Sequence, residues 1–528
     1  MTFTTGKPLL TTASRGRMPL ERVAVRLHPE DDVAIAREPL LPRTTLVDGE
    51  REIAVAQMVP PGHKIAIRPI GEDQPIRRYG QVIGFASVDI APGQHVHTHN
   101  VVVHQGELDL DYAFSSDMKP VDYVPETERR TFMGYRRADG RAGTRNYVAI
   151  LASVNCSSTA TRRIADHFRD KPIMEQYPNV DGVIGFPTKG GCGTHYGSSY
   201  LDQLQRTMAG IVDHPNVGAY IILSLGCETN QPEDLIETTS LKEGKPLVLT
   251  IQEDGGFEAS VAAGIAAVER LLPEANAAQR EPIPVSELMV ALQCGGSDGW
   301  SGVTANPALG RAADEIVRHG GTVVLGETSE VYGGEHLLTR RAISPEAGQK
   351  LVDKIHWWEQ YTSMFGTEID NNPSPGNKLG GLTTIYEKSL GAIAKAGTTP
   401  MTDVVDYAER VTARGFVHMD TPGYDPVSVT GQVAGGCNIV CFTTGRGSAF
   451  GFKPAPSIKI ATNPDLYRKQ EADMDINAGK MLDGTSLDEM GLEIFESIIA
   501  VASGEQTKSE RQGIGEEEFN PWIIGATL

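Results

Sequence analysis

The sequence contains few cysteines, and none of them form close pairs. Six cysteines among 528 residues are too few for a disulfide scaffold. No two stand in a CxxC arrangement, which excludes the short-spacing zinc and ferredoxin patterns. Basic residues are also in the minority, with 48 Lys and Arg against 68 Asp and Glu, a net charge of −20. This balance argues against nucleic acid as a partner, because phosphate binding requires the opposite sign.

Long hydrophobic runs and nucleotide-binding fingerprints are absent as well. The sequence has no stretch of about 18 apolar residues and no apolar signal-peptide core at its start. We therefore expect a cytoplasmic protein with no membrane partner. No glycine loop fits G-x-x-x-x-G-K-[ST] or G-x-G-x-x-G, which disfavours nucleotide binding. The remaining composition, 40% hydrophobic and 22% charged, is typical of a globular chain of several domains.

The pattern of apolar segments predicts a multidomain protein, with a small all-β domain followed by α/β parallel-sheet domains. Short β-rich pieces separated by proline and glycine turns predict the first domain, and alternating strands and helices predict the others. The expected boundaries are a tail at 1–19, a β domain at 20–104, a linker at 105–130, a middle domain at 131–285 and a C-terminal domain at 286–528. The expected strands are 147–154, 181–186, 217–225, 246–252, 288–293, 321–326, 438–442 and 457–461, and the expected helices are 158–169, 197–213, 230–237, 256–272, 303–318, 345–365, 380–396 and 487–501.

Four cysteines directly follow expected strands. Cys294 ends the run 288–293 and opens a glycine loop that also carries Asp298. Ligands of open α/β sheets bind in the crevice outside the carboxyl ends of the strands, which is where this loop is expected. Cys156, Cys192 and Cys227 follow other strands in the same way. Either small cysteines pack near the sheet ends, or their thiolates share a ligand.

Histidines and carboxylates supply a second group of candidate ligands. The segment 94–100 alternates His95, His97 and His99, so a strand would place all three imidazoles on one face, which suits a metal or an anion. The alternative is a solvated edge strand. Glu327 and Glu330 follow another expected strand, where they suit a hard metal or acid–base chemistry. The alternative is solvent-facing acids at a helix N-terminus.

Basic side chains in glycine-rich loops are candidates for gripping a carboxylate. Arg136 and Arg145 lie in a basic loop, and guanidinium groups bind carboxylates bidentately. This loop could equally be a structural turn with exposed arginines. His195 shares the loop 188–197 with a thiol and an amine. Lys378 stands in the rigid segment 371–381, and Arg446 follows Thr444 in a loop that could cradle an oxyanion.

Ten motifs occur in a fixed order along the chain: Gly62-His63-Lys64 and the segments 78–84, 95–100, 134–137, 191–192, 225–228, 294–299, 302–307, 372–378 and 444–447. Together they resemble the altronate/galactarate dehydratases, which remove water from sugar acids. The resemblance implies a β-clip N-terminal domain, a middle dimerisation region, a Rossmann-like C-terminal domain and a homodimer. It also implies iron dependence, with a divalent-metal site in the C-terminal domain. The histidine-rich segment is more similar to the altronate branch. Two alternatives stay open: a lyase acting on another hydroxy acid such as sulfolactate, and a sugar-acid binding protein without catalysis.

Dehydration of a dihydroxy acid to a 2-keto-3-deoxy acid requires a base at the α-carbon, an acid at the leaving hydroxyl and cations on the carboxylate. The candidate catalytic residues are Lys378, Arg446, His63, Lys64 and His195. The candidate substrate-binding residues are Arg136, Arg145, Ser297, Asn377 and Thr444.

Two hypotheses concern the metal. Thiolates of Cys192, Cys227, Cys294 and Cys156 would hold iron or an iron–sulfur cluster, or else oxygen and nitrogen ligands would hold a divalent cation, from among Asp298, Glu327, Glu330, His97 and His99. Four thiols at strand ends favour the first.

Overall fold

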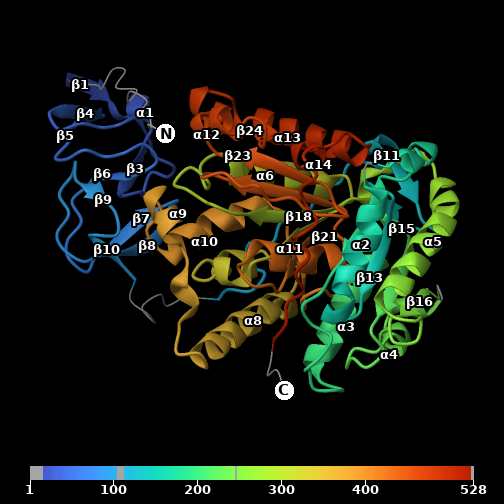
Figure 1. The fold of residues 1–528 in the computed structure, drawn as a ribbon. Coiled ribbons are helices and arrows are strands. Elements are labelled where there is room, and N and C mark those ends of the chain that lie inside the picture. The colour runs from blue at the N-terminus through green and yellow to red at the C-terminus, as the bar shows by residue number, and fades with distance from the viewer. Residues whose placement is uncertain (1–15, 104–111, 170, 244–245, 525–528) are drawn as a thin grey trace, which may run out of the picture.

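The computed structural model describes residues 16–103, 112–169, 171–243 and 246–524, which form three domains (Figure 1). The C-terminal domain lies in the centre of the molecule. The N-terminal β domain lies against one side of it, and the middle domain of the sequence lies against the other side. The C-terminal domain therefore contacts both of the others.

The N-terminal domain consists of three small sheets with the strand orders β1-β4-β5, β2-β3-β6-β9 and β10-β8-β7. Residues 16–19, expected to belong to a tail, instead form β1 and pair in parallel with β4. The elements are β1 Gly16–Pro19, α1 Leu20–Val23, β2 Ala24–Val25, β3 Val33–Ala36, β4 Thr44–Asp48, β5 Arg51–Ala54, β6 Lys64–Ala66, β7 Pro75–Arg78, β8 Gln81–Ala86, β9 His95–Val96 and β10 Val101–Val102.

The described part of the linker, 112–130, contains one 3-10 turn, η1 Glu126–Glu128. It follows the surface of the C-terminal domain, since Ser115 N donates to Thr339 O at 2.9 Å and Val124 N donates to Arg318 O at 2.8 Å. The first part of the expected linker, 105–111, lies outside the described residues.

The middle domain has a four-stranded, all-parallel sheet in the order β14-β13-β15-β16. A separate antiparallel sheet, β12-β11-β17, joins the beginning of the domain to its end. The elements are β11 Thr131–Arg136, β12 Ala142–Gly143, β13 Tyr147–Ala152, η2 Asn155–Ser157, α2 Ser158–Phe168, η3 Pro172–Gln176, β14 Gly182–Phe186, α3 Ser199–Val212, β15 Val217–Ser224, α4 Pro232–Thr238, η4 Ser240–Glu243, β16 Leu247–Thr250, α5 Phe257–Asn276 and β17 Arg280–Pro284.

The C-terminal domain has a seven-stranded parallel sheet in the order β20-β21-β19-β18-β22-β23-β24. The chain leaves β18 towards one edge and returns to place β22 on its other side, so β18 and β22 flank a topological switch point. The elements are η5 Val285–Glu287, β18 Met289–Cys294, α6 Ala305–Arg318, β19 Thr322–Leu325, η6 Thr328–Glu330, α7 Glu335–Thr339, α8 Pro345–Ser363, η7 Ile369–Asn371, α9 Pro375–Leu379, α10 Ile385–Ile393, η8 Ala394–Ala396, β20 Met401–Val405, β21 Gly415–Met419, α11 Asp425–Ala434, β22 Ile439–Thr444, β23 Ser457–Ala461, α12 Pro464–Lys469, β24 Ile476–Asn477, η9 Ala478–Asp483, α13 Leu487–Ala502 and α14 Lys508–Arg511.

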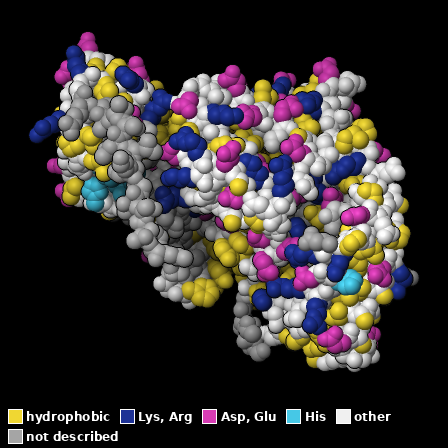
Figure 2. All heavy atoms as spheres, turned by 45° about the horizontal axis from the view of Figure 1, so that its top comes forward, with side chains coloured by type: hydrophobic (Ala, Val, Ile, Leu, Met, Phe, Trp, Pro, Cys, Tyr) yellow, Lys and Arg dark blue, Asp and Glu magenta, His cyan; other side chains and the backbone are white. Residues whose placement is uncertain are grey.

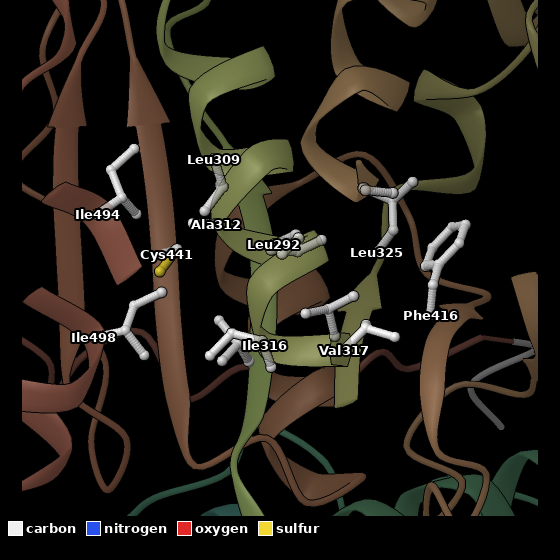
Figure 3. Close-up of a cluster of buried hydrophobic side chains, with 14 of the residues drawn as sticks. Leu292, Leu309, Ala312, Ile316, Val317, Leu325, Phe416, Cys441, Ile494 and Ile498 are labelled. Carbon is white, nitrogen blue, oxygen red and sulfur yellow. The ribbon is translucent and has the colours of Figure 1, made fainter. Parts of the chain in front are cut away.

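The main hydrophobic core lies between this sheet and the helices α6 and α13 (Figure 3). Leu292 and Leu325 of the sheet meet Leu309 and Ile316 of α6, and Ile494 of α13 completes the layer. All five side chains are at most 1% exposed. Such close packing holds β18 and β19 in fixed register, which fixes the loops that leave their carboxyl ends.

The other face of the sheet packs on the middle domain through α11 and α3. The last turns of the two helices meet, because a Cβ atom on Gly210 of α3 would lie 2.2 Å from Ala434 O of α11. Both helices follow carboxyl ends of strands, so the carboxyl ends of both parallel sheets face the same side of the molecule.

The visible surface carries acidic and basic side chains side by side (Figure 2). No extended basic surface is seen on this face, in keeping with the net charge of −20. Among the described residues, no helix has the length and apolar character needed to cross a membrane.

Candidate active site

The loop after β18 lies at the switch point of the C-terminal sheet. Its carboxylate, Asp298, is buried and accepts hydrogen bonds from Thr462 Oγ1, Asn463 Nδ2 and Ser301 Oγ at 3.1–3.2 Å. Burial raises the pKa of Asp298 and the hydrogen bonds oppose this. A Cβ atom on Gly445 would lie 2.1 Å from the Asp298 carboxyl carbon, so the loop of Arg446 passes directly over it. Asp298 holds two loops together and does not join the glutamates of the expected hard-metal set.

Cys294, Glu327 and Glu330 meet in a buried cluster beside this loop. The Cys294 sulfur lies 3.9 Å from Glu327 Oε2 and 3.5 Å from Glu330 Oε2. Lys395 Nζ lies 2.8 Å from the same sulfur and 3.4 Å from Glu327, and Lys388 Nζ lies 2.5 Å from Glu330 Oε1. We call these five residues the thiol–lysine cluster. Glu327 has a φ of 64°, a strained conformation that non-glycine residues adopt mainly at functional sites.

Burial shifts the pKa values of the thiol–lysine cluster. It raises the pKa of the Cys294 thiol to about 12, and burial together with the neighbouring Glu330 raises the pKa of Glu327 to about 8. Burial lowers the pKa of Lys395, but Cys294 and Glu327 outweigh it and raise the pKa overall. Asp425, whose carboxylate interacts with Glu330, Lys388 and Lys395, adds a third carboxylate beside the two ammonium groups. The lysines therefore do not neutralise the cluster. The Cys294 sulfur and one oxygen of each glutamate lie within 4.8 Å of one another, a spacing suited to a metal ion.

Three imidazoles of the N-terminal domain form a different cluster, the histidine triad of His63, His95 and His97. One ring nitrogen from each lies within 4.8 Å of the others, and His63 Nδ1 is 3.1 Å from His95 Nε2. Burial, reinforced by neighbouring cations, lowers the pKa of His95 to about 3 and that of His97 to about 4. Neutral imidazole is the form that ligates metals. His97 Nδ1 is also buried and has no hydrogen-bond partner among the described residues, so the triad fits a metal ion.

The triad lies where the N-terminal domain meets the C-terminal domain. His63 Nε2 lies 3.3 Å from Leu379 O, at the end of α9. Next to it, Lys64 Nζ donates to both oxygens of Glu387 in α10, at 2.8 and 2.9 Å, and to Gly381 O at 2.7 Å. Figure 1 shows α9 and α10 against the N-terminal domain. These bonds use all three protons of the Lys64 ammonium, so Lys64 positions the domains and has no proton donor left for substrate.

Arg78 completes the junction between the domains. It pairs with Glu387 and donates from Nη2 to Gly299 O at 2.7 Å, and all three charged side chains of the Lys64–Arg78–Glu387 network are at most 1% exposed. Burial raises the pKa of Glu387, but Lys64 and Arg78 outweigh it and lower the pKa to about 2. The carboxylate is therefore ionised and tied to two cations.

An open groove of about 710 Å³ runs along this junction. It is lined by Asp298, Trp300 and Leu379 and by several basic side chains, Arg22, Arg37, Arg446, Arg468 and Lys469. Arg446 is exposed, and Lys378 is half-buried next to Leu379 in α9. Its acidic side chains are Glu38, Asp298, Asp465 and Asp483, and Arg468 pairs with Asp465. The remaining guanidinium groups, of Arg22, Arg37 and Arg446, suit a carboxylate ligand.

Three other candidates hold the loops around the groove in place. Asn377 caps α9 in a capping box with Ser374 and donates to Ser297 O at 2.9 Å. Thr444 Oγ1 accepts a bond from Gly447 N at 3.0 Å. The side chains of Asn377, Ser297 and Thr444 are buried.

The remaining candidates lie away from the groove, in the middle domain. Arg145 is buried and donates all five of its N–H groups, to Glu510 and to three backbone carbonyls, so it has no donor for substrate. Arg136 donates to Gly140 O at 2.9 Å and pairs with Glu281. His195 is exposed in the loop before α3. Cys156, Cys192 and Cys227 are exposed and do not join Cys294, which is buried.

The sequence interpretation missed Glu387, Lys388 and Lys395. Glu387 and Lys388 lie within the otherwise apolar helix α10, and Lys395 follows it. Charged residues are almost never fully buried without a partner. Their position in an apolar segment was therefore a usable signal of buried ion pairs.

The whole chain matches one protein family. Its residues 22–104 match the altronate/galactarate dehydratase SAF domain, 134–276 the second domain of D-galactarate dehydratase/altronate hydrolase, and 285–527 the C-terminal domain of D-galactarate/altronate dehydratase. Altronate dehydratase of Bacillus subtilis is 35% identical over 96% of this chain and 99% of its own length.

Two further relatives extend the comparison. Galactarate dehydratase (L-threo-forming) of Escherichia coli is 38% identical over 94% of this chain and 96% of its own length. The beta subunit of (2R)-sulfolactate sulfo-lyase from Chromohalobacter salexigens is 33% identical over 75% of this chain and 97% of its own length. The match to the dehydratases confirms the resemblance noted in the sequence: the chain belongs to the altronate/galactarate dehydratase family of sugar-acid hydro-lyases.

Proposed function

We propose that this protein removes water from a hexonate or hexarate and releases a 2-keto-3-deoxy acid, with the groove between the N-terminal and C-terminal domains as its active site. The observation that carries the site assignment is the histidine triad, with an unpartnered His97 nitrogen, next to a groove lined by guanidinium groups. The family relationship supports the reaction class.

The alternative functions are not favoured. The altronate and galactarate dehydratases match 93% or more of the chain, whereas the sulfo-lyase subunit matches 75%. A binding protein without catalysis would not require the costly burial of two lysines and two glutamates in the thiol–lysine cluster.

In the proposed reaction, Arg446 binds the substrate carboxylate, and its charge stabilises the enediolate formed when the α-proton leaves. Lys378, as the neutral amine, accepts that proton and returns it to the β-hydroxyl, which leaves as water; Lys378 directly precedes Leu379 and Gly380, which line the groove. His63, His95 and His97 would hold a divalent metal, which supplies Lewis-acid stabilisation when bound. The enol product then tautomerises to the 2-keto acid.

Further properties belong to the same proposal. We infer that iron is the metal, that the protein is cytoplasmic and forms a homodimer, and that the C-terminal sheet is Rossmann-like, since removal of the edge strand β20 leaves the order of a doubly wound sheet. Metal analysis would test the identity of the metal, and light scattering would test the homodimer.

The deciding experiment is a turnover assay over a panel of hexonates and hexarates, read as 2-keto-3-deoxy acid, with and without chelation of divalent metals. Wild-type protein is expected to act on one member of the panel and to lose activity with the metal. His97→Ala should lose turnover and the metal bound at the histidine triad, whereas His167→Ala, at an exposed position of α2, should retain both. Lys378→Ala with near-normal turnover would remove Lys378 from the mechanism, and turnover of none of these acids would contradict the proposed function.

A further inference from the structure

Three of the six cysteines lie at the carboxyl edge of the middle-domain sheet, remote in sequence from the histidine triad. Cys156 follows β13, Cys192 follows β14 and Cys227 follows β15. In the sheet these strands are direct neighbours, in the order β14-β13-β15. Adjacent parallel strands lie about 4.8 Å apart, so the three loops leave the sheet side by side.

Backbone hydrogen bonds tie the three loops to one another. Asn155 N donates to Gly190 O at 3.0 Å, and Asn230 N donates to Gly191 O at 2.9 Å. Gly191 has a φ of +98°, and a Cβ atom there would lie 2.3 Å from Ser153 O, so the Cys192 loop rests directly on the end of β13. Each cysteine therefore lies at most three residues along the chain from a hydrogen bond between two of these loops. These bonds hold the backbones of the three loops in fixed positions relative to one another.

The exposure of these thiols excludes the packing explanation. Cys294, Cys437 and Cys441 are at most 2% exposed and fill space in the C-terminal core. Cys156, Cys192 and Cys227 are all exposed. An exposed thiol adds little packing, so their grouping at one sheet edge requires another explanation.

The polar groups around the thiols support a thiolate site. Gln252 Nε2 donates to the Cys227 sulfur at 3.3 Å, as donors do around sulfur ligands of clusters. The nearby carboxylate, Glu228, accepts bonds from Ser153 Oγ, Leu225 N and Gly226 N. These bonds engage both of its oxygens and hold the Cys227 loop in place.

The positions of the sulfurs argue against a single ion bound by all three thiolates. Three thiolates on one tetrahedral ion lie about 3.8 Å apart, given metal–sulfur bonds of about 2.3 Å. Among the described residues, the two groups of potential ligand atoms that all lie within 4.8 Å of one another are the histidine triad and Cys294 with its glutamates, so the three sulfurs are spread more widely. Thiolates that bind different irons of one cluster do not share a metal ion and need not lie so close together.

We propose that Cys156, Cys192 and Cys227 hold an iron–sulfur cluster at the carboxyl edge of the middle-domain sheet, a site separate from the histidine triad. The thiols bind as thiolates and release their protons to solvent. The sequence supplies no fourth cysteine at this edge, because the other three are buried in the C-terminal domain. One iron of a four-iron cluster would therefore have no cysteine ligand.

The test is the content of iron and acid-labile sulfide in full-length protein purified under anaerobic conditions, with its visible absorption spectrum. Wild-type protein should contain both elements in similar amounts and absorb as a cluster protein. Cys156→Ser, Cys192→Ser and Cys227→Ser should each lose most of the sulfide and the absorption while keeping the wild-type circular dichroism, because these side chains are exposed. Cys294→Ser, at a buried cysteine outside the group, should retain both.

Protein without sulfide, iron without sulfide, or sulfide that is undiminished in all three serine variants would overturn the proposal. The readout needs no substrate, so its failure is distinguishable from failure of the dehydratase assignment. Wild-type protein that turns over a sugar acid but holds no sulfide would refute the cluster alone.

Discussion

Replacement of Glu387 by glutamine should weaken the attachment of the N-terminal domain strongly. Glu387 accepts both Lys64 bonds and pairs with Arg78, and the whole network is at most 1% exposed. Glutamine has nearly the same shape but leaves two buried cations without a counter-charge. Removal of one partner from a buried ion pair costs about 3–5 kcal/mol, and we expect a loss of this size.

The matched control is Glu496→Gln. Glu496 also pairs with an arginine, Arg130, but the two side chains are 53% and 46% exposed. Exposed pairs contribute about 0–1 kcal/mol, so the control should be nearly neutral. The contrast between the variants isolates burial, because the chemical change is the same in both.

Urea unfolding followed by tryptophan fluorescence measures this effect. Trp300 is a local reporter, because its indole nitrogen would lie 3.2 Å from a Cβ atom on Gly62 of the N-terminal domain. The fluorescence change that disappears when Trp300 is replaced by phenylalanine reports the separation of the N-terminal domain from the C-terminal domain. A loss of less than 1 kcal/mol in Glu387→Gln, or one equal to that in Glu496→Gln, would refute the reasoning.

The pH dependence provides an internal check on the same variant. The pKa of Glu387 falls from 4.5 to about 2 on folding, so its contribution is fully present above pH 4.5 and is lost as the pH falls towards 2. The difference between wild type and Glu387→Gln should therefore shrink below pH 4.5. A constant difference down to pH 3 would show that the charge of Glu387 is not what matters.

Three further predictions concern other buried groups. Burial lowers the pKa of His214 and His418 to about 3, so their contribution to stability is complete above about pH 6.5 and is lost at lower pH; the melting temperature should fall between pH 7 and pH 5, and a flat profile would contradict this. Lys395→Met removes a cation from a carboxylate whose pKa is already about 8, so unfolding free energies should show a larger loss at pH 9 than at pH 6, and an equal loss would argue against the pairing. Gly445→Ala places a methyl group 2.1 Å from the Asp298 carboxyl carbon, so it should destabilise the protein by about 1–3 kcal/mol in denaturant titrations, more than Gly71→Ala, where the nearest atom to the new methyl group lies at 3.4 Å.

Much of the site can be predicted from the sequence, because apolar segments show where strands end and which polar residues follow them. The sequence places Cys294 and the pair Glu327 and Glu330 each just beyond the end of an expected strand. The two metal hypotheses separate them, with Cys294 among the thiolates and the glutamates beside Asp298, whereas the structure brings the Cys294 sulfur within 3.9 Å of both glutamates. Neighbouring parallel strands place their carboxyl ends together, so this grouping depends only on the order of two strands. The placement of the three middle-domain cysteines follows in the same way.

The residues that pair with these side chains could not be predicted from the sequence, since the pairing depends on tertiary contacts. Lys388 and Lys395 reach the cluster only because α10 packs on it, and Arg145 finds Glu510 across 365 residues of sequence. An arginine in a glycine-rich loop suits a carboxylate ligand, but a glutamate of the same chain satisfies it equally well. The strand β20 was missed because Met401–Val405 carries Thr402 and Asp403 at the edge of the sheet and has no apolar run.

The position of Glu387 next to Lys388 gives helix α10 a role that neither residue suggests alone. Successive residues of a helix point about 100° apart, so the two side chains face different neighbours. Glu387 binds Lys64 of the N-terminal domain, and Lys388 binds Glu330 of the thiol–lysine cluster. A shift of α10 that broke the first contact would also move the second. The N-terminal domain carries the histidine triad. A change in how this domain attaches to α10 would therefore also change the ion pair between Lys388 and Glu330 in the thiol–lysine cluster.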